Sequence, residues 1–230
     1  SVSYKHTRHG LFANGMVMHS WTHVPYTMAQ QLYGDYVVYS YADAKNDSKM
    51  FMAMGNIGKT LDFMRGSCNV NGSFSRNESH LFSQSQAVNS VSTGWSVGGK
   101  ISGSPCRWFS FDYRIDYSDS RLSMNGLSES WLSTMENELG LTFIPHRKWQ
   151  WTVSGEHYRN ELTENSYKNI VLLDTRLTYQ LNKKIEFAAS LTNILDRRSY
   201  NYTTYSELSS FESQRQLRGR QLLFSITLRK

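Results

Sequence analysis

The sequence predicts an all-β fold, an antiparallel transmembrane β-barrel with about 10–12 strands in this chain. Three observations predict it. Apolar and polar residues alternate with a period of two along much of the chain, as in a strand with one apolar and one polar face. Short turns alternate with long polar connections, which is typical of outer-membrane barrels. The longest uninterrupted apolar run, residues 50–54, is far shorter than the roughly 20 residues of a membrane-spanning helix.

Composition excludes several classes of protein. The chain has 230 residues, enough for one large β-domain or two small domains. It carries 25 Lys and Arg against 19 Asp and Glu, a formal net charge of +6, and its mean hydropathy is −0.52. Aromatic residues make up 13% and charged residues only 19%, which argues against disorder. Cys68 and Cys106 leave one disulfide or two free thiols open, and neither resembles a zinc site.

The alternation is weak in the first half of the chain, where Gly and Ser dilute it, and strong in the second half. The weak runs are residues 11–24, 36–42, 48–63, 66–76 and 90–101. The strong runs are residues 108–118, 139–143, 149–154, 170–179, 185–192 and 220–230. The longer polar connections are residues 26–35, 75–88, 118–133, 159–168 and 196–218. A soluble sandwich has strands of about five or six residues and no reason to alternate its loop lengths, so this rhythm favours the barrel.

The last strand has the clearest alternation. Its apolar face, which we expect to contact lipid, consists of Leu222, Phe224, Ile226 and Leu228. Aromatic residues near strand ends, such as Phe109, Trp149 and Tyr179, suit the girdles at the membrane–water interfaces. The alternative is an antiparallel sheet with one solvated face.

Charges on the predicted polar faces indicate a hydrated lumen. Asp112, Arg114 and Asp116 alternate in sign along one face of a single strand. Such charges cost little in a wide, wet lumen, whereas they would be expensive in a closed apolar core. We therefore expect a lumen that is wide or filled by a polar plug.

The end of the chain carries a specific motif. Residues 190–200 read Ser-Leu-Thr-Asn-Ile-Leu-Asp-Arg-Arg-Ser-Tyr, and the Arg-Gly-Arg sequence at 218–220 precedes the last strand. This arrangement resembles the C-terminal end of TonB-dependent outer-membrane transporters, whose penultimate strand runs into an Asn-(Leu/Ile)-(Phe/Leu)-Asp/Asn-(Lys/Arg)-x-x-Tyr motif. The matching residues are Asn193, Ile194, Leu195, Asp196, Arg197 and Tyr200.

The remainder of the chain is similar to barrels of this family from Bacteroidetes, most visibly in residues 5–15 and 26–39. One departure is the end of the chain. The family commonly closes on a terminal aromatic residue, whereas this chain ends Leu228-Arg229-Lys230.

The resemblance implies a 22-strand barrel with an N-terminal plug inside it. At roughly 20 residues per strand with its connection, 230 residues supply about half of such a barrel. We therefore expect residues 1–230 to be the C-terminal half of the barrel, with no plug domain. An open half-barrel would leave two unpaired edges in lipid, so it must close on itself or pair with further strands.

By this resemblance, the function is energised nutrient uptake across the cell outer membrane, with no catalytic residues, cofactor or metal. The implied partners are the N-terminal barrel strands and plug in this or another chain, outer-membrane lipid and lipopolysaccharide, TonB through the plug, and a surface lipoprotein. Nucleic acid is not expected, because no basic cluster contains interleaved aromatic residues. Aromatic residues of the long connections that could stack on a sugar or porphyrin are Phe82, Trp131 and Tyr205.

Two other functions stay open. The first is a self-closed barrel of 10 or 12 strands with a passive pore, structural or adhesion role. The second is an outer-membrane hydrolase, but Ser154 and His157 are three residues apart and so point to opposite faces of one strand. His19 and His23 share a face but lie some 13 Å apart at about 3.3 Å per residue, which disfavours a metal site.

Methionines cluster in two places, at Met16 and Met18 and at Met50, Met52 and Met54. We interpret them as filler that faces lipid or a plug, and the alternative is a methionine track that handles a metal.

Overall fold

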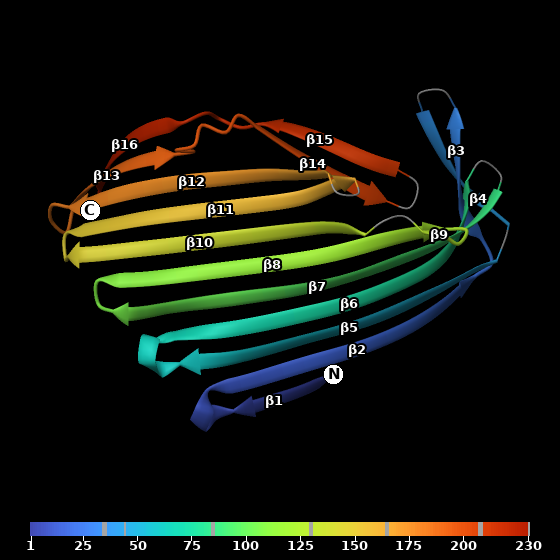
Figure 1. The fold of residues 1–230 in the computed structure, drawn as a ribbon, viewed down its shortest axis with the longest axis horizontal. Coiled ribbons are helices and arrows are strands. Elements are labelled where there is room, and N and C mark those ends of the chain that lie inside the picture. Colours follow the sequence, from blue (N-terminus) through green and yellow to red (C-terminus); the bar gives the residue numbers. More distant parts are fainter. Residues whose placement is uncertain are drawn as a thin grey trace.

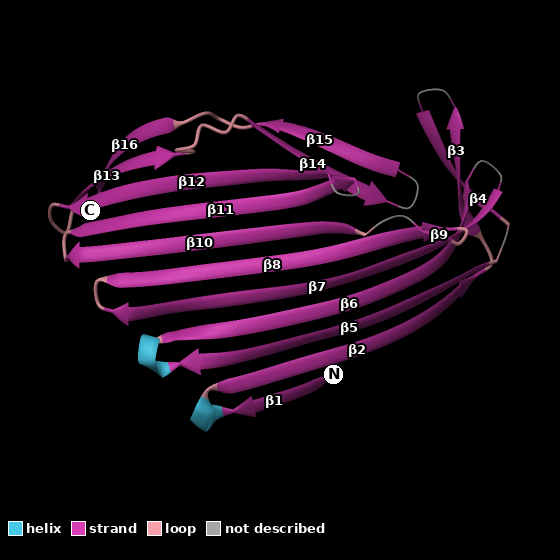
Figure 2. Ribbon diagram, in the orientation of Figure 1, coloured by secondary structure: helices cyan, strands magenta, loops and turns pink. Residues whose placement is uncertain are grey.

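The computed structural model describes residues 1–33, 36–43, 45–83, 86–128, 131–163, 166–206 and 209–229. The fold is all-β, and eleven antiparallel strands lie side by side in one strongly curved sheet (Figures 1 and 2). This confirms the predicted all-β class and the antiparallel arrangement. In order across the sheet, these strands are β1 (Val2–His6), β2 (Leu11–Val24), β5 (Asn46–Leu61), β6 (Gly66–Ser83), β7 (Gln86–Cys106), β8 (Phe109–Met124), β10 (Leu132–His146), β11 (Trp149–Thr163), β12 (Ser166–Gln180), β13 (Ile185–Thr192) and β16 (Gln221–Leu228).

The smaller elements lie at the ends of these strands. They are the 3-10 turns η1 (Thr7–His9) and η2 (Asp62–Met64), the strands β3 (Thr27–Tyr33), β4 (Tyr36–Ala42) and β9 (Leu127–Ser128), and the hairpin of β14 (Ser199–Ser206) and β15 (Ser209–Gln216). The short connections gather at one end of the sheet and the long ones at the other (Figure 1). We call the first the short-turn end and the second the long-loop end.

Much of the sequence predicted as long connection is strand. β6 and β7 pair from Ser67↔Ser102 as far as Ser83↔Gln86, through most of the predicted 75–88 connection. β8 likewise continues to Met124, and β14 and β15 fill most of the predicted 196–218 connection. These extensions carry polar residues on both faces, so they show no apolar–polar alternation that a sequence pattern could reveal.

The register divides the side chains of the sheet into an apolar face and a polar face. On one face of the sheet, Ile57 lies opposite Val70, and Tyr113 lies opposite Leu139. These apolar side chains are well exposed, with Ile57 at 58% and Val70 at 50%. Successive residues of a strand point to opposite faces, so the intervening positions form the second face. That face is rich in Asn, Ser, Thr and charged residues.

The apolar face continues to the last strand. Leu222, Phe224, Ile226 and Leu228 pair with Leu191, Ala189, Phe187 and Ile185. Phe224 is 77% exposed. Contact of these four side chains with lipid stays a prediction.

The sheet is not closed. β1 pairs only with β2, and β16 pairs only with β13, among the residues that the structure describes. These two strands lie at opposite margins of the sheet (Figure 1). Closure into a barrel therefore stays a prediction, and two edges with free backbone groups need partners.

Candidate functional site

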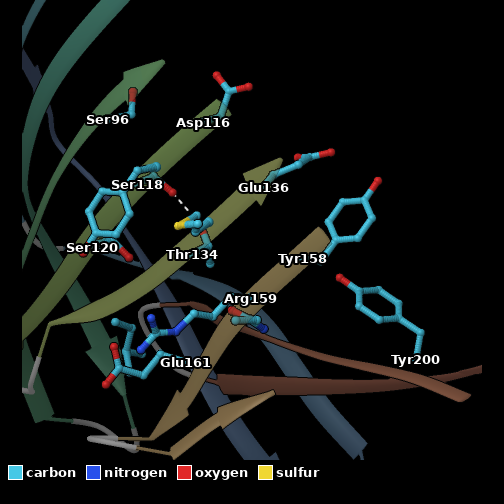
Figure 3. Close-up of a pocket in the computed structure, with 14 residues that line it drawn as sticks. Ser96, Asp116, Ser118, Ser120, Thr134, Glu136, Tyr158, Arg159, Glu161 and Tyr200 are labelled. Atoms are coloured by element: carbon cyan, nitrogen blue, oxygen red, sulfur yellow. Dashed lines mark hydrogen bonds between the residues drawn. The ribbon is translucent and has the colours of Figure 1, made fainter. Parts of the chain in front are cut away.

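The polar face holds a pocket of about 500 Å³ in the half of the sheet nearer the long loops. Figure 3 shows the side chains that line it. β8, β10 and β11 form its floor, and Tyr200 of β14 contributes to its wall. The polar side chains that line the pocket and are suited to binding a ligand are Asp116, Ser118, Thr134, Glu136, Tyr158 and Tyr200.

The strand register places these groups. Asp116 lies opposite Glu136, which in turn lies opposite Tyr158, so one row crosses three strands. Gly98 continues the row on β7, and a Cβ atom there would clash with Asp116 Oδ1. The missing side chain at Gly98 therefore leaves the space that the Asp116 carboxylate occupies.

Hydrogen bonds and ion pairs hold the polar groups of the pocket. Arg114 Nε donates to Asp116 Oδ2 at 2.5 Å, and the Tyr158 hydroxyl donates to Glu156 Oε2 at 3.2 Å. The Ser118 and Thr134 hydroxyls are 2.6 Å apart. An ionised carboxylate can accept about four hydrogen bonds, and these donors supply fewer. The carboxylate oxygens can therefore also accept hydrogen bonds from a ligand.

Carboxylates outnumber cations on the polar face of the second half of the sheet, although the whole chain has a net charge of +6. The acidic residues on this face are Asp112, Asp116, Glu136, Glu138, Glu156, Asp174 and Glu186, and the basic ones are Lys100, Arg114, Lys168 and Arg176. The pocket is therefore suited to ligand groups that donate hydrogen bonds, such as hydroxyls and amines.

An aromatic pair borders the pocket. The rings of Tyr158 and Tyr200 lie 6.0 Å apart at an interplanar angle of 54°. Tyr200 comes from β14, which contacts β11 and β12. Two aromatic faces beside acceptor groups can bind the apolar side of a ring or an organic cation.

The motif at residues 193–200 fixes the base of the β14–β15 hairpin. Asn193 is buried and has a φ of 50°, a left-handed conformation that Asn tolerates. Its Nδ2 donates to the carbonyls of Arg197 and Arg218 at 2.7 and 2.8 Å, and its Oδ1 accepts the Arg197 N–H at 2.9 Å. Its own N–H donates to Asp174 Oδ1 at 2.7 Å. Asn193 thus ties both ends of the hairpin to the sheet.

Asp196 completes this turn. Its Oδ1 accepts the backbone N–H of Arg220 at 2.9 Å, and Arg198 Nη2 donates to Oδ2 at 3.2 Å. The Arg220 N–H, and then the Arg198 guanidinium, hold the pKa of Asp196 below its usual value. A Cβ atom at Gly219 would lie 2.8 Å from this carboxylate, so the Arg-Gly-Arg sequence gives the carboxylate room. The motif residues are therefore structural, and they position Tyr200 at the pocket.

We expect the Asp196 turn to loosen in acid. Because its pKa is lowered in the folded chain, the ionised carboxylate stabilises the turn at neutral pH, and this stabilisation is lost as the pH falls through the folded pKa. The protection factor of the Arg220 amide against hydrogen exchange should fall below about pH 4. In Asp196→Asn, an amide oxygen can still accept the Arg220 N–H, and the acid-dependent fall should be smaller. An equally steep fall in both proteins would contradict this role.

Of the three predicted ligand-contact residues, the structure describes the side chain of Trp131, and it does not line this pocket. Trp131 lies under the Arg121 guanidinium, whose carbon is 4.9 Å from the ring centroid. Arg121 follows the pocket residue Ser120 in β8 and therefore points to the other face. The side chains of Phe82 and Tyr205 lie outside the described residues.

Other residues singled out in the sequence are separated. Ser154 and His157 lie on opposite faces of β11, and His157 instead contacts Asn137 at 3.1 Å. Cys68 and Cys106 are both free thiols. Among the described residues, no group of three or more His, Cys, Asp or Glu side chains could hold a metal ion.

Sequence reasoning missed the pocket residues Glu136 and Tyr158. Each lies on the polar side of an alternating strand, and only the register shows that they are neighbours. One signal was available, because an aromatic residue on an otherwise polar face is unusual and marks Tyr158.

Comparisons with known proteins identify no relative: no protein-family model, curated protein or solved structure matches this chain. Within the described part of the chain, no helix has the length and apolar character required to cross a membrane.

Proposed function

We propose that this chain forms part of the wall of an outer-membrane β-barrel that takes up a nutrient in a TonB-dependent manner. The observation that carries the proposal is a curved sheet of long antiparallel strands with an exposed apolar face and a polar, charged face. Apart from its two open edges, such a sheet pairs its backbone groups internally, and it presents one face to hydrocarbon and the other to water. A soluble protein rarely exposes so continuous an apolar surface.

The short-turn end supports a membrane interface. Aromatic rings pack against each other on the apolar face there, with Phe143 5.0 Å from Phe109 and Trp149 4.5 Å from Tyr179, measured between centroids. The adjoining turns carry many cations and, among their described residues, one acidic residue, Asp62. The cations are Arg8, Arg65, Arg107, Arg147, Lys148, Lys183, Lys184 and Arg229. Aromatic rings next to cations suit a lipid headgroup region with anionic phosphates.

The pocket supports a role in binding a ligand within the lumen. Its carboxylates and hydroxyls face the polar side of the sheet, and the hairpin that carries Tyr200 is held by the family motif. In the proposal, further barrel strands and a plug, in this chain or another, pair with the two open edges. TonB then acts through the plug, and lipopolysaccharide and a surface lipoprotein contact the long-loop end. The chain itself is proposed to be no enzyme.

Crosslinking between the edge strands in outer membranes tests this proposal. Ser3→Cys in β1 and Ser225→Cys in β16 are introduced together after Cys68 and Cys106 are replaced by Ser. We expect no crosslink, in a protein that fractionates with the outer membrane and is heat-modifiable, because other strands separate the two edges. Efficient crosslinking would overturn the proposal in favour of a self-closed barrel with a passive pore, structural or adhesion role.

A further inference from the structure

Five of the nine methionines lie together on the polar face of β2 and β5. Met16 is directly opposite Met54, and Met18 is directly opposite Met52. Met50, which is opposite Ser20, extends the group along β5. We call these five residues the methionine cluster.

The cluster lies on the face where apolar side chains are otherwise scarce. On β6, the cross-strand partners of Met54, Met52 and Met50 are Ser73, Ser75 and Asn77. The apolar face of the same two strands holds Val17 and Ala53 instead. Met18 and Met54 are 37% and 41% exposed. The cluster therefore does not face the predicted lipid, so the interpretation as lipid-facing filler does not explain it.

The register brings the sulfur atoms within reach of one another. Side chains directly opposite in an antiparallel pair have Cβ atoms about 4.5–5.5 Å apart, and neighbours along one strand face are about 6.6 Å apart. Methionine is unbranched and has three rotatable bonds, so several thioethers of the cluster can turn toward one point.

The chemistry of this surface selects a soft cation. Thioether sulfur is a soft, uncharged donor that favours Cu(I), whereas Mg²⁺, Ca²⁺ and Zn²⁺ need oxygen, imidazole or thiolate ligands. In the described parts of β2, β5 and β6, the polar-face positions carry no His, Cys, Asp or Glu. His19 and His23 alternate with the methionines and so point to the other face.

We propose that the methionine cluster is a thioether site for a soft monovalent cation of the Cu(I) class. The inference stands on the register of two strands and goes beyond the proposed uptake function. Binding needs no deprotonation, since thioethers do not titrate, so the site should work equally at neutral and acidic pH.

Titration of the full chain with Ag(I), a redox-stable counterpart of Cu(I), tests the site. The background is Cys68→Ser and Cys106→Ser, because thiols would bind silver themselves. We expect stoichiometric binding to this protein and its loss when Met16, Met18, Met50, Met52 and Met54 are all replaced by Leu. Leucine conserves volume, so the fold should persist, which circular dichroism checks. The matched control replaces the other four methionines, Met28, Met64, Met124 and Met135, by Leu and should bind as before.

The pH dependence separates thioether from imidazole ligation. Silver binding should be the same at pH 7 and at pH 5, where histidines are largely protonated and lose affinity for metals. The proposal is overturned if silver does not bind, if binding survives the five substitutions, if the control set abolishes it, or if it is lost at pH 5.

Discussion

Val70→Arg is expected to destabilise the protein by about 2–4 kcal/mol in a lipid bilayer, the cost of an arginine on the lipid face near the midplane of a β-barrel. Val70 is half exposed on the apolar face of β6. It lies four residues beyond the start of the strand at Gly66, which is about 13 Å from the short-turn end at 3.3 Å per residue. That depth is near the middle of an apolar band about 25 Å tall.

The adjacent residue gives the matched control. Asn71 is also exposed, and it points to the polar face of the same strand. Asn71→Arg should therefore change the free energy of unfolding little, because the guanidinium stays hydrated. Urea titration of the protein folded into phospholipid vesicles measures both variants. If the sheet had two solvated faces, both substitutions would fall within about 0.5 kcal/mol of the parent, which would contradict membrane insertion.

The sequence was sufficient to predict the strands in which apolar residues lie on one face and polar residues on the other. Residues 185–192 were predicted as a strand and are β13, since Ile185, Phe187 and Leu191 all face the apolar side. Alternation failed where both faces are polar. In β7, Gly and Ser weaken the alternation, and the run predicted at residues 90–101 covers only part of the 21 residues of this strand.

The pocket could not be predicted from local sequence, because its row of polar groups forms across strands. Asp116, Glu136 and Tyr158 are each about 20 residues apart in the chain and become neighbours only through the register. The hairpin that brings Tyr200 to them was predicted as a loop. The motif residues were recognised by resemblance, yet the resemblance did not reveal that Asn193 bonds to Arg197 and Arg218.

The methionine cluster illustrates the same limit. The spacing of Met50, Met52 and Met54 places them on one face of a strand, but sequence alone left open whether that face meets lipid or an interior. The register shows that these methionine side chains lie on the same face as Asn56 and Asn14, opposite to the face of Val17. The distinction matters because it excludes the interpretation of these methionines as lipid-facing filler and places their sulfur atoms on the polar face.

Asn193→Ala is expected to lower the free energy of unfolding by about 3–4 kcal/mol, through loss of structure at the base of the β14–β15 hairpin. The substitution removes three side-chain hydrogen bonds, each worth about 1 kcal/mol net, and leaves the carbonyls of Arg197 and Arg218 and the Arg197 N–H without this partner. It also forces Ala into a left-handed conformation at φ 50°, which costs roughly 1 kcal/mol more. The free energy of unfolding measures the total cost.

Asn193→Gly separates the two contributions, because glycine adopts a positive φ without strain but has no side chain to bond. Asn193→Gly should lower the free energy of unfolding by about 3 kcal/mol. The additional loss in Asn193→Ala then measures the backbone strain. Limited proteolysis locates the effect, since both variants should be cut in the β14–β15 hairpin well before the sheet strands. If Asn193→Gly were as stable and as resistant as the parent, the Asn193 bonds would not hold the hairpin. Tyr200 would then need another support at the pocket.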